Sequence, residues 1–189
     1  MVQPLKRESP TWTAEELFRH PELEPCELVH GKVVPMAPTG FLHGNIESRL
    51  TMRLGFYATE NDRGLVAGGE VGIVIRRDPD TVRAADVLFI SRQRLGQGPV
   101  RGYLEVAPEL VVEILSPEDR WSEVMEKLAD YFEAGVDRIW VVDPRVRKVF
   151  AYRSLSQVET FADGQTLRDE ELLPGFVVVI SELFGRPTE

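Results

Sequence analysis

The sequence has a single cysteine, Cys26, among its 189 residues. An intrachain disulfide needs two cysteines and a thiolate zinc cluster needs several, so counting excludes both. Any bound metal must therefore rest mainly on oxygen ligands or histidine.

Long apolar stretches and domain linkers are also missing. No run approaches the roughly 20 residues that a membrane-spanning helix requires, and the opening MVQPLKRESPTW lacks the apolar middle of a signal peptide. We therefore expect a cytoplasmic protein. There is no repeat, low-complexity tract or Gly/Ser linker, and 189 residues with 43% apolar composition suit one hydrophobic core. We expect a single domain over residues 1–189.

Positive charge is scarce as well. The formal net charge is -9, which opposes nonspecific attraction to phosphate backbones. This counts against a nucleic-acid enzyme without excluding one, because a metal site itself needs acidic groups and basic residues can gather locally. Charge runs of this kind are usually solvated surface; the candidates for contact with a polyanion are Arg76-Arg77, Arg92-Arg94 and Arg145-Arg147-Lys148.

The segments that are present alternate between helical and extended patterns. HGNIESRLTMRLGFYATE carries Ile46, Leu50 and Leu54 at helical spacing, and a second helix is predicted from about residue 120 to a C-cap at Gly135. Three strands, GEVGIVI, VRAADVLFI and ELVVEILS, lie between these helices, and RIWVV and KVFAYR follow them. The order of helix, three strands, helix and strand, with extra β structure at both ends, predicts a mixed α/β sheet.

Several local signals refine this outline. A short helix capped by Thr13 is expected near the start, and Ser116 before Pro117 resembles the cap of the second long helix. The dipeptide Asp163-Gly164 is a hairpin signal in the tail. The aromatic residues Tyr131 and Trp140 are expected in the core.

Two carboxylates interrupt apolar strands. Asp86 lies within VRAADVLFI and Glu113 within ELVVEILS, among residues that favour burial. An ionised carboxylate in such a strand must be paired, hydrogen-bonded or metal-bound. If the two strands are neighbours, both carboxylates can lie at one end of the sheet, as a hard cation such as Mg²⁺ requires. The alternative is an outward-facing or salt-bridged acid.

Lys127 lies at the border of its predicted helix's apolar arc, about 40° outside the edge, beside Tyr131. A lysine in this position could run its stem along the core and hold its ammonium toward the strand end that carries Glu113. The alternative is an exposed lysine paired with Glu123 or Glu126.

Together these segments resemble a known family. The stretches CELVHGKVVPMAPTGFLHGNIESRL, VRAADVLFI and PELVVEILSPEDRWSEVMEKLADYFEAGVDRIWVVDP are similar, in this order, to the Uma-type restriction endonuclease family of the PD-(D/E)xK nuclease superfamily. The resemblance runs from about Glu27 to Arg153. It implies a restriction-endonuclease-like mixed β-sheet core. Ala85 replaces the proline of the signature, and Leu115 stands where the signature has lysine, so the resemblance assigns the lysine to Lys127.

The resemblance implies a Mg²⁺- or Mn²⁺-dependent endonuclease acting on DNA. Asp86, Glu113 and the backbone carbonyl of Ile114 would hold the metal, and Lys127 would act on the attacking water or on the transition state. Glu27 and His43 also match family positions and are expected to support the site. Glu70, at the head of GEVGIVI, could reach it as well.

Two alternatives stay open. The chain could be a catalytically inactive binding or regulatory module, which its acidity favours, or a metal-dependent hydrolase of RNA or nucleotide phosphates. A homodimer would suit an enzyme that cuts both strands of a duplex, because a two-fold axis relates two such sites. The sequence does not indicate the interface.

Overall fold

The computed structural model describes residues 11–97 and 101–185. The opening segment in which no signal peptide was expected lies largely outside the described residues. Within the described part, no helix is both long enough and apolar enough to cross a membrane.

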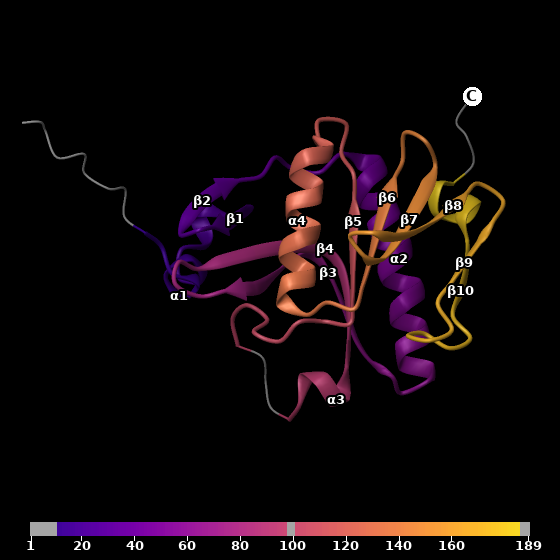
Figure 1. Ribbon diagram of the computed structural model, residues 1–189, viewed down its shortest axis with the longest axis horizontal. Coiled ribbons are helices and arrows are strands. Elements are labelled where there is room, and N and C mark those ends of the chain that lie inside the picture. Colours follow the sequence, from indigo (N-terminus) through magenta and orange to yellow (C-terminus); the bar gives the residue numbers. More distant parts are fainter. Residues whose placement is uncertain (1–10, 98–100, 186–189) are drawn as a thin grey trace, which may run out of the picture.

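One mixed sheet forms the centre of the molecule (Figure 1). Its strand order is β2-β1-β4-β5-β6-β7-β8, and β3 pairs with β4 along the edge of the sheet. All neighbours are antiparallel except β5 and β6, which are parallel and are connected through α4. The strands are β1 Cys26–Val29, β2 Lys32–Pro35, β3 Gly64–Arg76, β4 Thr81–Ser91, β5 Leu110–Ile114, β6 Arg138–Asp143, β7 Lys148–Ser154 and β8 Gln157–Ala162. A separate two-stranded sheet pairs β9 Thr166–Arg168 with β10 Val177–Val179.

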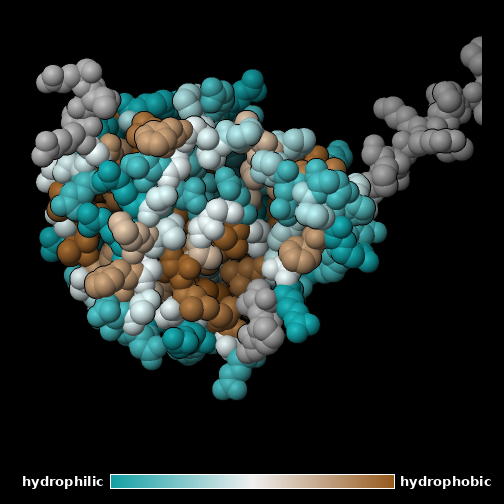
Figure 2. Space-filling view, turned by 180° about the vertical axis from the view of Figure 1, so that it is seen from behind, coloured by the Kyte–Doolittle hydropathy of each residue, from teal (hydrophilic) through white to brown (hydrophobic). Residues whose placement is uncertain are grey.

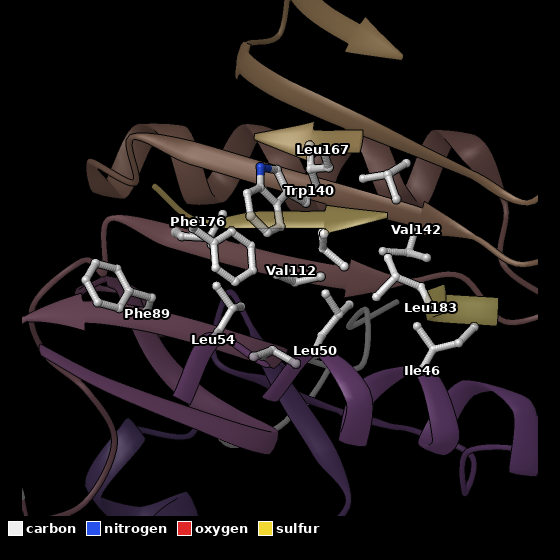
Figure 3. Close-up of a cluster of buried hydrophobic side chains, with 14 of the residues drawn as sticks. Ile46, Leu50, Leu54, Phe89, Val112, Trp140, Val142, Leu167, Phe176 and Leu183 are labelled. Carbon is white, nitrogen blue, oxygen red and sulfur yellow. The ribbon is translucent and has the colours of Figure 1, made fainter. Parts of the chain in front are cut away.

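The two long helices cover opposite faces of the sheet. Helix α2, Phe41–Glu60, packs on one face with the C-terminal segment, and helix α4, Trp121–Ala134, packs on the other. Figure 3 shows Leu50 and Leu54 of α2 beneath Val112 and Trp140 of the sheet. Every side chain of β5 is buried, as expected for a central strand covered on both faces. The short helices are α1 Ala14–Phe18, η1 Pro21–Leu23, α3 Arg92–Leu95 and α5 Ile180–Phe184.

A small N-terminal unit extends the sheet beyond its main core. Leu17 of α1 and Leu28 of β1 are fully buried against Val82 of β4. The β1–β2 hairpin joins the sheet through β4, so it lies beside the end of the strand that carries Asp86.

The observed order α2, β3, β4, β5, α4, β6 confirms the predicted order of elements. Two local predictions are wrong. Asp163 and Gly164 form a turn, but β8 pairs with β7 and β9 pairs with β10, so no hairpin closes across it. Helix α4 begins only at Trp121, so Ser116 does not cap it; the Ser116 N–H instead bonds to Asp119 Oδ2 at 2.7 Å within a tight turn.

Candidate active site

Strand register brings the two predicted carboxylates together. Strands β4 and β5 are antiparallel with Val87 opposite Val112, so the next pair along the ladder is Asp86 and Glu113. Asp86 and Glu113 are both buried. The N–H of Ile114 donates to Asp86 Oδ2 at 2.6 Å, which fixes Asp86 to the neighbouring strand.

Lys127 reaches this pair from α4. Its Nζ donates to Glu113 Oε2 at 2.7 Å and to the carbonyl of Ala84 at 2.8 Å, and it lies 3.1 Å from Glu27 Oε1. Only 19% of the lysine side chain is exposed. The alternative of an exposed lysine paired with neighbours on its own helix is therefore wrong.

Strand geometry explains how a lysine on a helix can serve a carboxylate on a strand. Alternate residues of a strand share a face, and the side chains of Val111 and Leu115 pack against α4. Glu113 lies between them on that face. Because Leu115 fills core space there, the ammonium group comes from the overlying helix.

Tyr131 also binds Glu113, although the sequence placed it in the core. The residue is fully buried, as expected, but its hydroxyl donates to Glu113 Oε1 at 2.7 Å. Both oxygens of Glu113 therefore accept a hydrogen bond from α4. An aromatic residue on an apolar helical arc gives no sequence signal that its hydroxyl will meet a carboxylate.

Glu27 contacts both Lys127 and the first residues of β4. Its Oε2 pairs with Arg83 at 2.7 Å and its Oε1 accepts the N–H of Ala84 at 3.0 Å. Burial opposes ionisation, but Lys127 and Arg83 outweigh it and lower the pKa of Glu27. This carboxylate is therefore ionised and already engaged on both oxygens.

His43 lies on the other side of Asp86. Its Nε2 is 3.3 Å from Asp86 Oδ1, and its Nδ1 is 3.4 Å from the hydroxyl of Ser116. Burial alone would lower the pKa of His43, but Asp86, Glu47 and Glu70 outweigh it and raise that pKa. Among the described residues, Nε2 has no hydrogen-bond partner of good geometry.

Glu47 belongs to the same environment and was missed from the sequence. It follows His43 by one helical turn of α2, a spacing that places both on one side of the helix. Burial and the charge of Asp86 raise the pKa of Glu47, and Glu70 adds to the effect. Glu70 itself lies at an irregularity in β3 with a φ of 53°, and the structure gives it no direct contact with Asp86 or Glu113.

The charge balance of the centre favours a cation. Burial raises the pKa of Glu113 to about 8; Lys127 and Tyr131 oppose this shift, and the charge of Asp86 adds to it. Burial alone would lower the pKa of Lys127, but the carboxylates of Glu113, Glu27 and Asp86 raise it, so the ammonium keeps its proton. The charge of Asp86 thus opposes the ionisation of Glu113, and a divalent cation bound between them would relieve this repulsion.

The described residues contain no group of three or more His, Cys, Asp or Glu side chains arranged to hold a metal. The predicted centre has only two such ligands, Asp86 and Glu113, with the Ile114 carbonyl as a third donor. A residue whose N–H points at one neighbouring strand presents its carbonyl to the same strand, so the Ile114 carbonyl faces β4. Mg²⁺ commonly binds one or two carboxylates and keeps several waters. The residues present fit such an ion.

Sequence and structural comparisons identify a family and a fold. The model of the family Uma2, described as "Putative restriction endonuclease", matches residues 14–181. The fold is similar to the crystal structure of "a putative nuclease belonging to DUF820" from Anabaena variabilis ATCC 29413, with a TM-score of 0.78 and 21% identity, covering 91% of this chain and 97% of that chain. No curated protein matches the chain. The structural likeness confirms the predicted fold class.

Proposed function

The chain belongs to the Uma2 family, and from this premise we propose that it is a single-domain, metal-dependent endonuclease that hydrolyses phosphodiester bonds in DNA. The observation that carries the proposal is the buried contact of Lys127 Nζ with Glu113 Oε2 at 2.7 Å, one strand away from Asp86. Two carboxylates at a strand end can hold a metal ion for phosphoryl hydrolysis, and a lysine beside them can stabilise negative charge on the transition state.

Asp86, Glu113 and the Ile114 carbonyl would hold Mg²⁺ or Mn²⁺. When bound, the ion supplies Lewis-acid polarisation of the phosphate and a water of lowered pKa. The restriction-endonuclease description of the family is what favours a divalent ion and a DNA substrate.

Lys127 would supply a fixed positive charge at the reacting phosphate. Its raised pKa makes it a poor proton acceptor, so charge stabilisation and water orientation suit it better than general-base catalysis. Glu27 and Tyr131 would act as positioning residues, since one contacts Lys127 and the other Glu113. His43 would orient Asp86 from the opposite side.

The test combines metal titration with cleavage. Calorimetry with Mg²⁺ and Mn²⁺ and a nicking assay on supercoiled plasmid are applied to the wild type and to Asp86→Asn, Glu113→Gln and Lys127→Met. We expect both carboxylate variants to lose metal binding and nicking together. Lys127→Met should still bind metal but nick at least about 100-fold more slowly, because it removes charge stabilisation and not a ligand.

Glu126→Gln is the matched control, because Glu126 is an exposed carboxylate one residue from Lys127. It should bind metal and nick like the wild type. A wild type that binds neither ion at millimolar concentration would contradict metal dependence and favour the noncatalytic module. Metal-dependent cleavage of RNA or nucleotides without DNA nicking would keep the metal centre and replace the substrate.

A further inference from the structure

The outer side of helix α2 carries no charge. At about 100° per residue, the helix and its N-cap present an arc of about 160° that excludes all the acidic and basic residues of the helix, which are His43, Glu47, Arg49, Arg53 and Glu60. The arc contains Gly40, Phe41, Gly44, Asn45, Ser48, Thr51, Met52, Gly55, Phe56, Ala58 and Thr59, of which Ala58, at the edge of the arc beside Gly40, is buried. In a chain with 28% charged residues, an uncharged arc on a surface helix is unusual.

Three large apolar side chains on this arc face solvent. Phe41 is 91% exposed, Met52 67% and Phe56 70%. Figure 2 views the molecule from the side on which α2 lies, and apolar side chains there interrupt the polar surface. Single exposed apolar residues need no explanation, but several on one helical face are typical of an interaction surface.

The same arc carries glycines that the chain itself does not explain. A Cβ at Gly40, Gly44 or Gly55 would meet no atom within 4 Å, and none of the three has a positive φ. Gly40 is the N-cap, where glycine is tolerated. Gly44 and Gly55 lie inside the helix, where each costs about 1 kcal/mol relative to alanine.

The glycines and the large side chains are arranged symmetrically about Ser48. Phe41 precedes Ser48 by seven residues and Gly55 follows it by seven; Gly44 precedes it by four and Met52 follows by four. Gly40 and Phe56 stand eight residues before and after it. In an antiparallel pair of α2 helices centred on Ser48, each large side chain would lie level with a glycine of the other helix. Phe41 and Met52 lie within about 40° of Ser48 around the helix, so they would meet the open space beside Gly55 and Gly44, whereas Phe56 lies about 80° from Ser48, at the rim of the contact.

We propose that the chain forms a homodimer in which the outer face of α2 packs antiparallel against the same face of a second copy, with the two-fold axis at Ser48. The self-complementary register identifies a second copy as the occupant, because a two-fold interface must match its own surface. His43 lies about 200° from Phe41 around α2, so the candidate active site stays open. The proposal stands independently of the proposed function.

Sedimentation velocity over protein concentrations of about 1 to 200 µM tests the association. We expect a reversible dimer with a micromolar dissociation constant, because one helix pair is smaller than a standard interface. Met52→Asp and Phe56→Asp should be monomeric at every concentration. Val177→Asp is the matched control, since Val177 is a 53% exposed apolar residue on β10, and it should dimerise like the wild type.

Glycine substitutions separate the interface from simple folding effects. Gly55→Leu should raise the melting temperature of the monomer, since leucine is the better helix former and a Cβ there meets no atom of the same chain. It should also weaken the dimer at least about tenfold, because it fills the space opposite Phe41. In a Cys26→Ser background, Ser48→Cys should crosslink to itself on mild oxidation far faster than Glu60→Cys at the exposed end of the helix.

Three results would overturn the proposal. The first is a wild type that stays monomeric throughout the concentration range. The second is a dimer that Met52→Asp, Phe56→Asp or Gly55→Leu leaves unchanged, since association would then use another face. The third is a Ser48→Cys variant that crosslinks no faster than Glu60→Cys, since the antiparallel register would then be wrong.

Discussion

At the scale of single residues, the contacts of the candidate site converge on Glu113, which accepts hydrogen bonds from Lys127 and Tyr131. Glu113 must lose its proton to bind a cation, and its pKa is raised to about 8. Under the proposed function, Mn²⁺ affinity should therefore rise about tenfold per pH unit below pH 8 and level off above it. Calorimetric titration across this range measures the profile.

The variant Tyr131→Phe tests the same dependence of Mn²⁺ affinity on the pKa of Glu113. The hydroxyl of Tyr131 bonds to Glu113 and helps to hold the pKa of Glu113 down, so its loss should move the pH at which affinity levels off upward. Affinity at neutral pH should fall accordingly. Tyr152→Phe is the control, because Tyr152 is another buried tyrosine, on β7 and outside the site. Identical pH profiles for Tyr131→Phe and the wild type would contradict the positioning role of Tyr131.

Residues of the candidate site could be predicted from the sequence only where they departed from the apolar pattern of their own strand or helix. Asp86 and Glu113 were found because carboxylates in apolar strands are costly, and the helix border together with the family resemblance pointed to Lys127. Tyr131 and Glu47 broke no such pattern. Tyr131 fits an apolar arc, and Glu47 is an ordinary helical acid until β3 and Asp86 surround it.

At the scale of elements, Asp80 joins α1 to the sheet. Its Oδ2 accepts the N–H of Ala14, the first residue of α1, at 2.8 Å and pairs with Arg77 at 2.9 Å. Asp80→Ala should leave the buried Ala14 N–H without a partner and cost about 1 to 3 kcal/mol of stability. Chemical denaturation measures the loss. Glu105→Ala, an exposed acid that also pairs with Arg77, should cost much less.

The pH dependence of Asp80 has a defined sign. Burial opposes its ionisation, but the N–H groups of Ala14 and Asp78, with Arg77, outweigh it and lower the pKa of Asp80. A carboxyl with a lowered pKa stabilises the fold above its unfolded-state pKa of about 3.9 and loses that contribution as pH falls through the folded value. The stability difference between the wild type and Asp80→Asn should therefore be constant near neutrality and shrink below about pH 4. A difference that grows on acidification would contradict this linkage.

Element boundaries followed from the sequence where caps and periodicity were strong. Gly135 ends α4 in the left-handed conformation, as predicted, with a φ of 99°. The start of β3 was missed, because the predicted strand GEVGIVI began at Gly69, whereas the strand begins at Gly64 and passes through Gly68 and Gly69 with a shift of register. A local turn signal does not tell which neighbour a strand pairs with, and β8 pairs with β7 and not with β9.

At the scale of the whole molecule, charge pairing limits the basic surface. Each arginine of the three predicted clusters forms an ion pair with an acidic side chain; the partners are Asp130 for Arg76, Asp80 for Arg77, Asp62 for Arg92, Asp137 for Arg94, Asp143 for Arg145 and Asp163 for Arg147. With a net charge of -9, long-range attraction to DNA is weak. Under the two proposals, binding of DNA would then depend on the metal centre and on the two active sites of the dimer acting together.

The proposed nuclease activity and the proposed dimer together predict whether the cleaved plasmid is linear or nicked. The strands of a duplex are themselves related by two-fold axes, so a symmetric dimer presents one site to each strand. The wild type should convert supercoiled plasmid to linear product without long accumulation of the nicked form. Met52→Asp should nick at a similar rate per chain but linearise poorly, because a monomer must bind twice, at independent positions. If Met52→Asp gives the wild-type ratio of linear to nicked product, the two sites act independently even if the dimer forms.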